Sequence, residues 1–189
     1  MTEQEAIQAR DPFALATSRG LRFYVGTPAE DIAILAWQRK MLEDGEFFTI
    51  FTDVRQAPSS FLDLFRPPNL LFYKLNADDA IHYAAWFTPS WFGAFGSVWV
   101  ARSIRGTHVG EESFLLGQCI MAIGFKLYPL LGGITSRTPF VAKNADKWYV
   151  NMGKLPYKLN GEHDQWLLFY TKEQFENGPF NPFQSGQET

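Results

Sequence analysis

The chain has 189 residues, of which 46% are hydrophobic and 16% aromatic, including 18 phenylalanines. This composition excludes a disordered chain and favours one folded domain with a substantial core. The formal net charge is only −3, which gives no global electrostatic reason to expect nucleic acid or an anionic membrane as a partner.

The single cysteine and the first residues indicate the compartment. Cys119 has no partner for an internal disulfide and falls in an apolar helical stretch, so we expect a buried thiol in a reducing compartment. The first five residues are polar and acidic, unlike a signal peptide, and no apolar stretch is long enough to span a bilayer. The sequence predicts a cytoplasmic protein, or a component of an assembly made in the cytoplasm.

The first half of the chain changes from helical to strand-like periodicity near residue 70. Residues 1–20 are polar and contain a proline, so we expect an N-terminal extension with at most a short, loosely packed helix. Thr27 and Glu30 form a capping box, with Pro28 at the first helical position. We expect a strand at 21–25, helices at 27–45 and 59–65, and strands at 70–75, 81–87 and 95–102.

The second half begins with apolar residues that recur at helical spacing from Leu115 to Leu127. This order of elements predicts an α/β (α+β) domain over 21–172, with helices on both faces of a sheet. Residues 173–189 form a polar, Gly/Pro-rich tail apart from Phe180 and Phe183. We expect a helix at 111–127 that ends before Pro129 and Gly132-Gly133, a strand at 134–137, a helix at 144–152, and strands at 155–159 and 166–170.

One segment combines a strand, a glycine-bearing turn and the start of a helix. The run Arg105-Gly106-Thr107-His108-Val109-Gly110 follows the strand-like residues 97–102 and precedes the helix at 111–127. Such a turn directs backbone N–H groups and a helix N-terminus at one point, which suits an anion such as a pyrophosphate. It resembles the acyl-CoA signature of the GNAT (Gcn5-related N-acetyltransferase) superfamily, roughly Arg/Gln-x-x-Gly-x-Gly/Ala. Arg105 and Gly110 fill its first and last positions, and His108 stands at its middle glycine.

The resemblance covers about residues 21–170 and implies a fold, an activity and a cofactor. It implies a mixed, mostly antiparallel central sheet of about seven strands. The implied reaction moves an acetyl or acyl group from a CoA thioester to a primary amine. Acetyl-CoA would be held by five residues: Val100, Arg105, Gly106, His108 and Gly110.

A second match to the same family lies in the helix expected at 144–152. The family pattern Asn-x-x-Ala-x-x-Leu-Tyr-x-x-x-Gly-Phe aligns with Ala145, Trp148, Tyr149 and Gly153. The resemblance implies that Tyr149 protonates the departing CoA thiolate as a general acid. The structural alternative is a core tyrosine with its hydroxyl at the rim. His82 or a carboxylate-held water are the candidate bases, and the three histidines lack the spacing of a metal site.

A non-enzymatic interaction protein is the competing interpretation. A side chain at His108 narrows the phosphate turn, and Glu111 and Glu112 place two carboxylates beside it. The aromatic run Trp86–Phe92 would form a protein-binding loop, with an ordinary sheet core around a β-bulge as the alternative, and the tail with Phe180 and Phe183 would dock onto a partner. Small divergent chains of this type are similar to some that tailed bacteriophages encode, including virion components.

Overall fold

The computed structural model describes residues 1–45, 54–101, 109–135, 149–159 and 163–184. Within these ranges no helix is long and apolar enough to cross a membrane. The helices are α1 (Glu3–Gln8), α2 (Pro12–Ser18), α3 (Pro28–Glu43), α4 (Pro58–Asp63), α5 (Val109–Leu127) and α8 (Lys172–Asn177). The strands are β1 (Arg22–Phe23), β2 (Leu70–Leu75), β3 (Ile81–Ser90), β4 (Gly93–Val100), β5 (Leu130–Thr135), β6 (Val150–Leu159) and β7 (His163–Thr171).

The strands form one sheet of seven in the order β1-β2-β3-β4-β5-β7-β6. Neighbouring strands are antiparallel except β4 and β5, which are parallel and joined by α5. A parallel pair needs such a crossover connection, because a tight turn can only reverse the chain. The predicted mixed, mostly antiparallel sheet is therefore confirmed.

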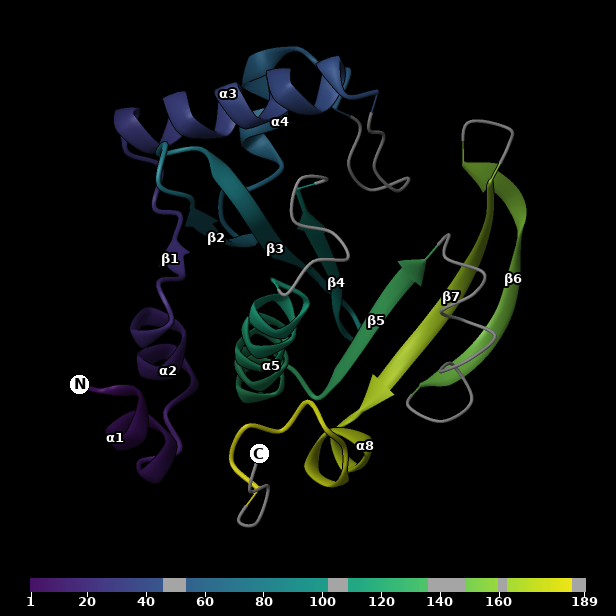
Figure 1. Ribbon diagram of the computed structural model, residues 1–189. Helices are drawn as coiled ribbons and strands as arrows, with labels where there is room; N and C mark the ends of the chain where they lie inside the picture. The colour runs from purple at the N-terminus through teal and green to yellow at the C-terminus, as the bar shows by residue number, and fades with distance from the viewer. Residues whose placement is uncertain (46–53, 102–108, 136–148, 160–162, 185–189) are drawn as a thin grey trace.

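Helices cover both faces of the sheet, as predicted (Figure 1). On one face α5 packs through Ile120 and Ile123 in a cluster with Tyr83 and Phe87 of β3. On the other face α3 and α4 cover β2 to β4 with an aromatic cluster: Trp37, Phe61, Phe65, Trp86 and Trp99. The two layers hold the centre of the sheet between them.

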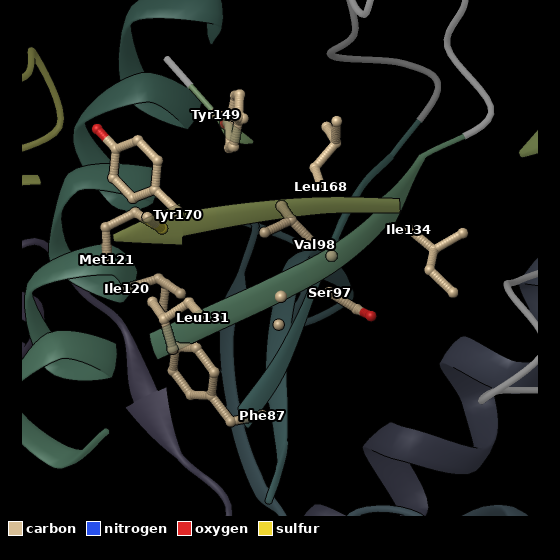
Figure 2. A pocket seen from close by; sticks show the side chains of 13 residues that line it. Phe87, Ser97, Val98, Ile120, Met121, Leu131, Ile134, Tyr149, Leu168 and Tyr170 are labelled. Carbon is tan, nitrogen blue, oxygen red and sulfur yellow. The ribbon is translucent and has the colours of Figure 1, made fainter. Parts of the chain in front are cut away.

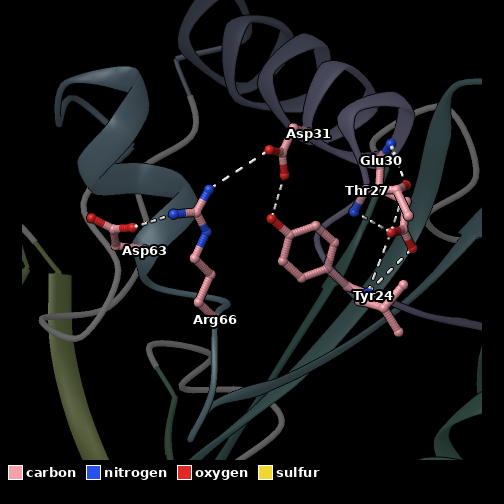
Figure 3. A network of polar contacts seen from close by, with 7 residues as sticks. Tyr24, Thr27, Glu30, Asp31, Asp63 and Arg66 are labelled. Atoms are coloured by element: carbon pink, nitrogen blue, oxygen red, sulfur yellow. Dashed lines mark hydrogen bonds and ion pairs between the residues drawn. The ribbon is translucent and has the colours of Figure 1, made fainter.

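A polar network fixes α3 and α4 against the start of the sheet (Figure 3). The predicted capping box forms, with the Thr27 N–H donating to Glu30 at 2.9 Å. Tyr24 donates its hydroxyl proton to Asp31 at 2.5 Å. Burial, with the hydrogen bond to Asp31, raises the pKa of Tyr24 to about 12, so this donor stays protonated at neutral pH. Arg66 lies 3.7 Å from the same Asp31 carboxylate and links it to α4.

The N-terminal residues are packed more firmly than the sequence suggests. Helices α1 and α2 form, and Ala6 and Leu15 are completely buried in the cluster around α5. Arg19 donates to the carbonyl of Leu115 in α5 at 2.7 Å and pairs with Glu3 at 2.7 Å. The expectation of a loosely packed extension is wrong, because small and apolar residues spaced along two short helices fit the outer side of α5.

The tail is also ordered by contacts within the chain. Helix α8, which the sequence analysis did not include, starts at a capping box between Thr171 and Gln174. Phe180 and Phe183 pack against the core cluster around α5. Both rings are therefore partly buried by contacts within the chain, and the expected docking of the tail onto a partner stays a prediction.

Three predicted segments differ in the structure. The run Trp86–Phe92 is no loop, because β3 continues to Ser90 and buries Trp86; only Trp91 at the turn is fully exposed, at 95%. Gly132-Gly133 lie inside β5 rather than ending a helix. Of the helix expected at 144–152, residues 150–152 are the start of β6, which pairs with β7, while 144–148 lie outside the described residues. Strand pairing at the sheet edge overrides the helical spacing there.

Candidate functional site

The parallel strands β4 and β5 separate shortly after they meet. Their register contains two pairs, Ala94 with Leu131 and Phe95 with Gly132, although β4 continues to Val100 and β5 to Thr135. On their outer edges both strands stay paired, β4 with β3 and β5 with β7. The backbone groups that face each other beyond the last pair are therefore placed to bind a ligand between the strands.

A cavity of about 240 Å³ lies at this separation (Figure 2). It is bounded by β3, β4, β5, β7 and the middle of α5. Most of its wall is apolar, which suits a thin, largely apolar ligand segment. The lining residues are Phe87, Gly96, Ser97, Val98, Ile120, Met121, Leu131, Gly132, Gly133, Ile134, Tyr149, Leu168 and Tyr170.

Tyr149 belongs to this wall, although it does not lie on a helix. It immediately precedes β6, and its ring centroid is 5.1 Å from that of Tyr170. Burial raises the pKa of Tyr149 to about 12, and burial together with Tyr149 raises the pKa of Tyr170. Both phenols are therefore neutral hydrogen-bond donors at physiological pH. Tyr149, a candidate residue from the sequence, lines the cavity together with Ser97 and Tyr170, which the sequence did not indicate because their positions depend on strand register.

The segment with the GNAT-like signature connects the end of β4 to the start of α5. Strand β4 ends at Val100 and α5 begins at Val109, so the predicted strand and helix are confirmed, while residues 102–108 between them lie outside the described part of the chain. Gly110 lies in the first turn of α5, while Arg105, Gly106 and His108 lie outside the described residues. The structure thus brings Val100 and Gly110 to the two ends of the turn.

A charged pair lies beside the start of α5. Lys74 of β2 forms an ion pair and hydrogen bond with Glu112, so this carboxylate is partly neutralised within the protein. His82 is buried, at 8% exposed, and its burial lowers its pKa despite the nearby Glu112 charge. His82 is not among the residues that line the cavity. The structure therefore does not bring this candidate base together with Tyr149.

The residues at the separation fit the pantetheine arm of an acyl-CoA. That arm is narrow and carries amide groups, which can pair with the facing backbone edges of β4 and β5. Gly96, Gly132 and Gly133 line the cavity and add no side chains to it. Gly96 could not be enlarged without pressing on Phe87, since a Cβ there would lie 3.3 Å from its ring.

No protein-family model matches the chain, and no curated protein sequence matches it. Solved structures of acetyltransferases do match. A GCN5-related N-acetyltransferase from Kribbella flavida is 18% identical, with 80% of this chain and 98% of that one covered and a TM-score of 0.56. Mutant forms of the spermidine/spermine N-acetyltransferase SpeG from Vibrio cholerae are 10% identical, with 84% and 97% covered and a TM-score of 0.62. The chain therefore has the fold of the GNAT superfamily.

Proposed function

We propose that the protein is a GNAT-like N-acyltransferase that moves an acetyl or acyl group from a CoA thioester to a primary amine. The observation that carries the proposal is the separation of β4 from β5 after two residue pairs, with Tyr149 in the wall of the cavity there. Acyl-CoA would supply the activated carbonyl. A primary amine as acceptor agrees with the polyamine named for the SpeG structures.

Balanced chemistry assigns two tasks to the protein, polarising the carbonyl and protonating the sulfur, while water accepts the proton that the amine loses. The amine nitrogen forms a bond to the carbonyl carbon, the carbon–sulfur bond breaks, and one proton leaves the amine while the sulfur acquires one. Backbone N–H groups of β4 beyond Phe95 would polarise the carbonyl oxygen. Tyr149 would donate to the departing sulfur, and its raised pKa of about 12 keeps that donor protonated at neutral pH.

The phosphate end of the ligand would lie at the turn before α5. Arg105, Gly106 and His108, together with the backbone at Gly110, are proposed to hold the pyrophosphate through N–H groups and positive charge. The imidazole of His108 can donate a hydrogen bond to phosphate although it narrows the turn. The pairing of Glu112 with Lys74 reduces the repulsion that a free carboxylate would exert there.

Acetyl-CoA binding and thiol release together test the proposal. Calorimetry should give saturable binding, and ligand at 100 times its dissociation constant should raise the free energy of unfolding by about 2.7 kcal/mol. Adding a panel of primary amines should then release free thiol. Absence of both at millimolar acetyl-CoA would refute the proposal and leave the interaction role, including that of a virion component.

A matched pair of variants tests where the ligand binds. Val98 lines the cavity and is 55% exposed, so Val98→Trp should fill the space at little cost in stability. Val25 is 68% exposed and does not line the cavity. Val98→Trp should abolish acetyl-CoA binding while Val25→Trp retains it. Equal affinity in both variants would place the ligand elsewhere.

A further inference from the structure

The chain after α8 runs along the flank of α5. We call residues 178–183 the tail segment. The carbonyl of Pro179 accepts a hydrogen bond from the buried Gln118 side chain at 2.8 Å. The ring of Phe180 lies 5.4 Å from that of Phe114, one turn closer to the start of α5. The tail segment is therefore fixed to the helix at two successive turns.

The same segment reaches the wall of the cavity through an aromatic contact. The ring of Phe180 meets that of Tyr170 edge to face, with centroids 6.0 Å apart. Tyr170 in turn lies 5.1 Å from Tyr149, and both tyrosines line the cavity. Phe180 does not line the cavity itself, so it contacts the cavity wall from behind and is connected to Tyr149 through Tyr170.

The approach of the chain to Tyr170 requires a glycine. A Cβ at Gly178 would lie 2.7 Å from the Tyr170 hydroxyl and 2.4 Å from the carbonyl oxygen of Gln174. That same carbonyl accepts a hydrogen bond from the Tyr170 hydroxyl at 3.3 Å. Tyr170 is thus held at its hydroxyl by the end of α8 and at its ring by Phe180.

We infer that Phe180 of the tail segment is a positioning residue of the acyl-CoA site, which holds Tyr149 through Tyr170. The inference rests on the proposed function. A hydrogen-bond donor acts on a reacting atom only within a narrow range of positions. A displacement of about 1 Å can reduce the rate by up to about a hundredfold. Tyr149 immediately precedes the edge strand β6, and packing of Tyr170 on its ring restricts its position.

A double-mutant cycle separates positioning from general stability. Phe180→Ala should lower kcat by about tenfold, with the KM for the amine changed by less than about twofold. In a Tyr149→Phe background the same change should lower kcat by less than about twofold, since the positioned hydroxyl is already absent. Phe183→Ala is the matched control in the same segment, and it should leave kcat within about twofold of the wild type. Equal losses from Phe180→Ala in both backgrounds would overturn the inference.

A measurement without catalysis distinguishes this inference from the proposed function. In proton–carbon spectra of labelled tyrosines, Phe180→Ala should shift the ring signals of Tyr170 and Tyr149 and leave that of Tyr24 in place. If the signals shift but the protein does not turn over acetyl-CoA, the packing contact is supported and the proposed function is refuted. Unshifted signals at Tyr149 would overturn the positioning role whatever the activity.

Discussion

The point where β4 and β5 meet depends on Gly93, and replacing it tests the geometry of the site. A Cβ at Gly93 would lie 2.1 Å from the carbonyl oxygen of Leu130 and 3.0 Å from its carbonyl carbon. These are backbone atoms of β5, so no side chain can turn aside. Overpacking costs 1–3 kcal/mol in well-packed cores. The φ of +154° adds a backbone preference for glycine. We expect Gly93→Ala to lower the free energy of unfolding by about 3 kcal/mol.

Urea titration followed by tryptophan fluorescence measures this loss, and thermal unfolding should show a midpoint lower by roughly 6–12 °C. Gly117→Ala in α5 is the matched control, because nothing lies within 4 Å of a Cβ there. It should stabilise the protein by about 0.5–1 kcal/mol, since alanine is the better helix former. Gly93→Ala should also weaken acetyl-CoA binding, as the strands are forced apart. A Gly93→Ala variant as stable as the wild type would refute the close approach.

Three further predictions concern charge, pH and the turn. Arg19→Ala should lower the free energy of unfolding by about 2 kcal/mol, because it removes the charged donor to the Leu115 carbonyl; Lys172→Ala, in an exposed pair, should change it by less than about 0.5 kcal/mol in the same titrations. Folding raises the pKa of Tyr149 from 10 to about 12. The contribution of its neutral phenol to the free energy of unfolding is therefore fully present below pH 10 and is lost as the pH rises to 12. Tyr149→Phe should therefore flatten the fall in stability measured across that range. His108→Gly should preserve or tighten acetyl-CoA affinity in calorimetry, because it restores amide access to the pyrophosphate; weaker binding would count against the assigned turn.

The elements that the sequence predicts well are those formed by interactions between residues close together in the chain. The helix α5 follows from a long apolar repeat, and its observed start at Val109 is two residues before the expected one. The capping box at Thr27 and Glu30 needs only side chains three residues apart, and it forms as predicted. Strands β2 and β3 are joined by a turn whose Asn76 side chain accepts from two following N–H groups. Such contacts do not depend on the rest of the fold.

The predictions that were wrong or incomplete concern residues whose structure depends on segments far away in the sequence. Residues 150–152 join β6 because β7 offers an edge with free backbone groups, a fact absent from their own sequence. Residues 88–90 extend the expected strand because β4 pairs with them. The tail rings Phe180 and Phe183 pack against the hydrophobic cluster around α5. An apolar residue in an apparent loop therefore indicates burial, but the partner that buries it cannot be read from the residue itself.

The candidate site combines both kinds of information. Its signature turn was visible in the sequence because an anion needs N–H groups in one short segment. Its cavity was not, because the cavity depends on how far two parallel strands remain paired. That length is two residue pairs, and it starts where Gly93 lets β4 touch the Leu130 carbonyl. One glycine at the closed end thus determines where the strands begin to separate, and the turn before α5 is proposed to hold the phosphate end of the ligand. A change at either end should therefore alter ligand binding, weakening it for Gly93→Ala and preserving or tightening it for His108→Gly, and only the change at Gly93 should also cost stability.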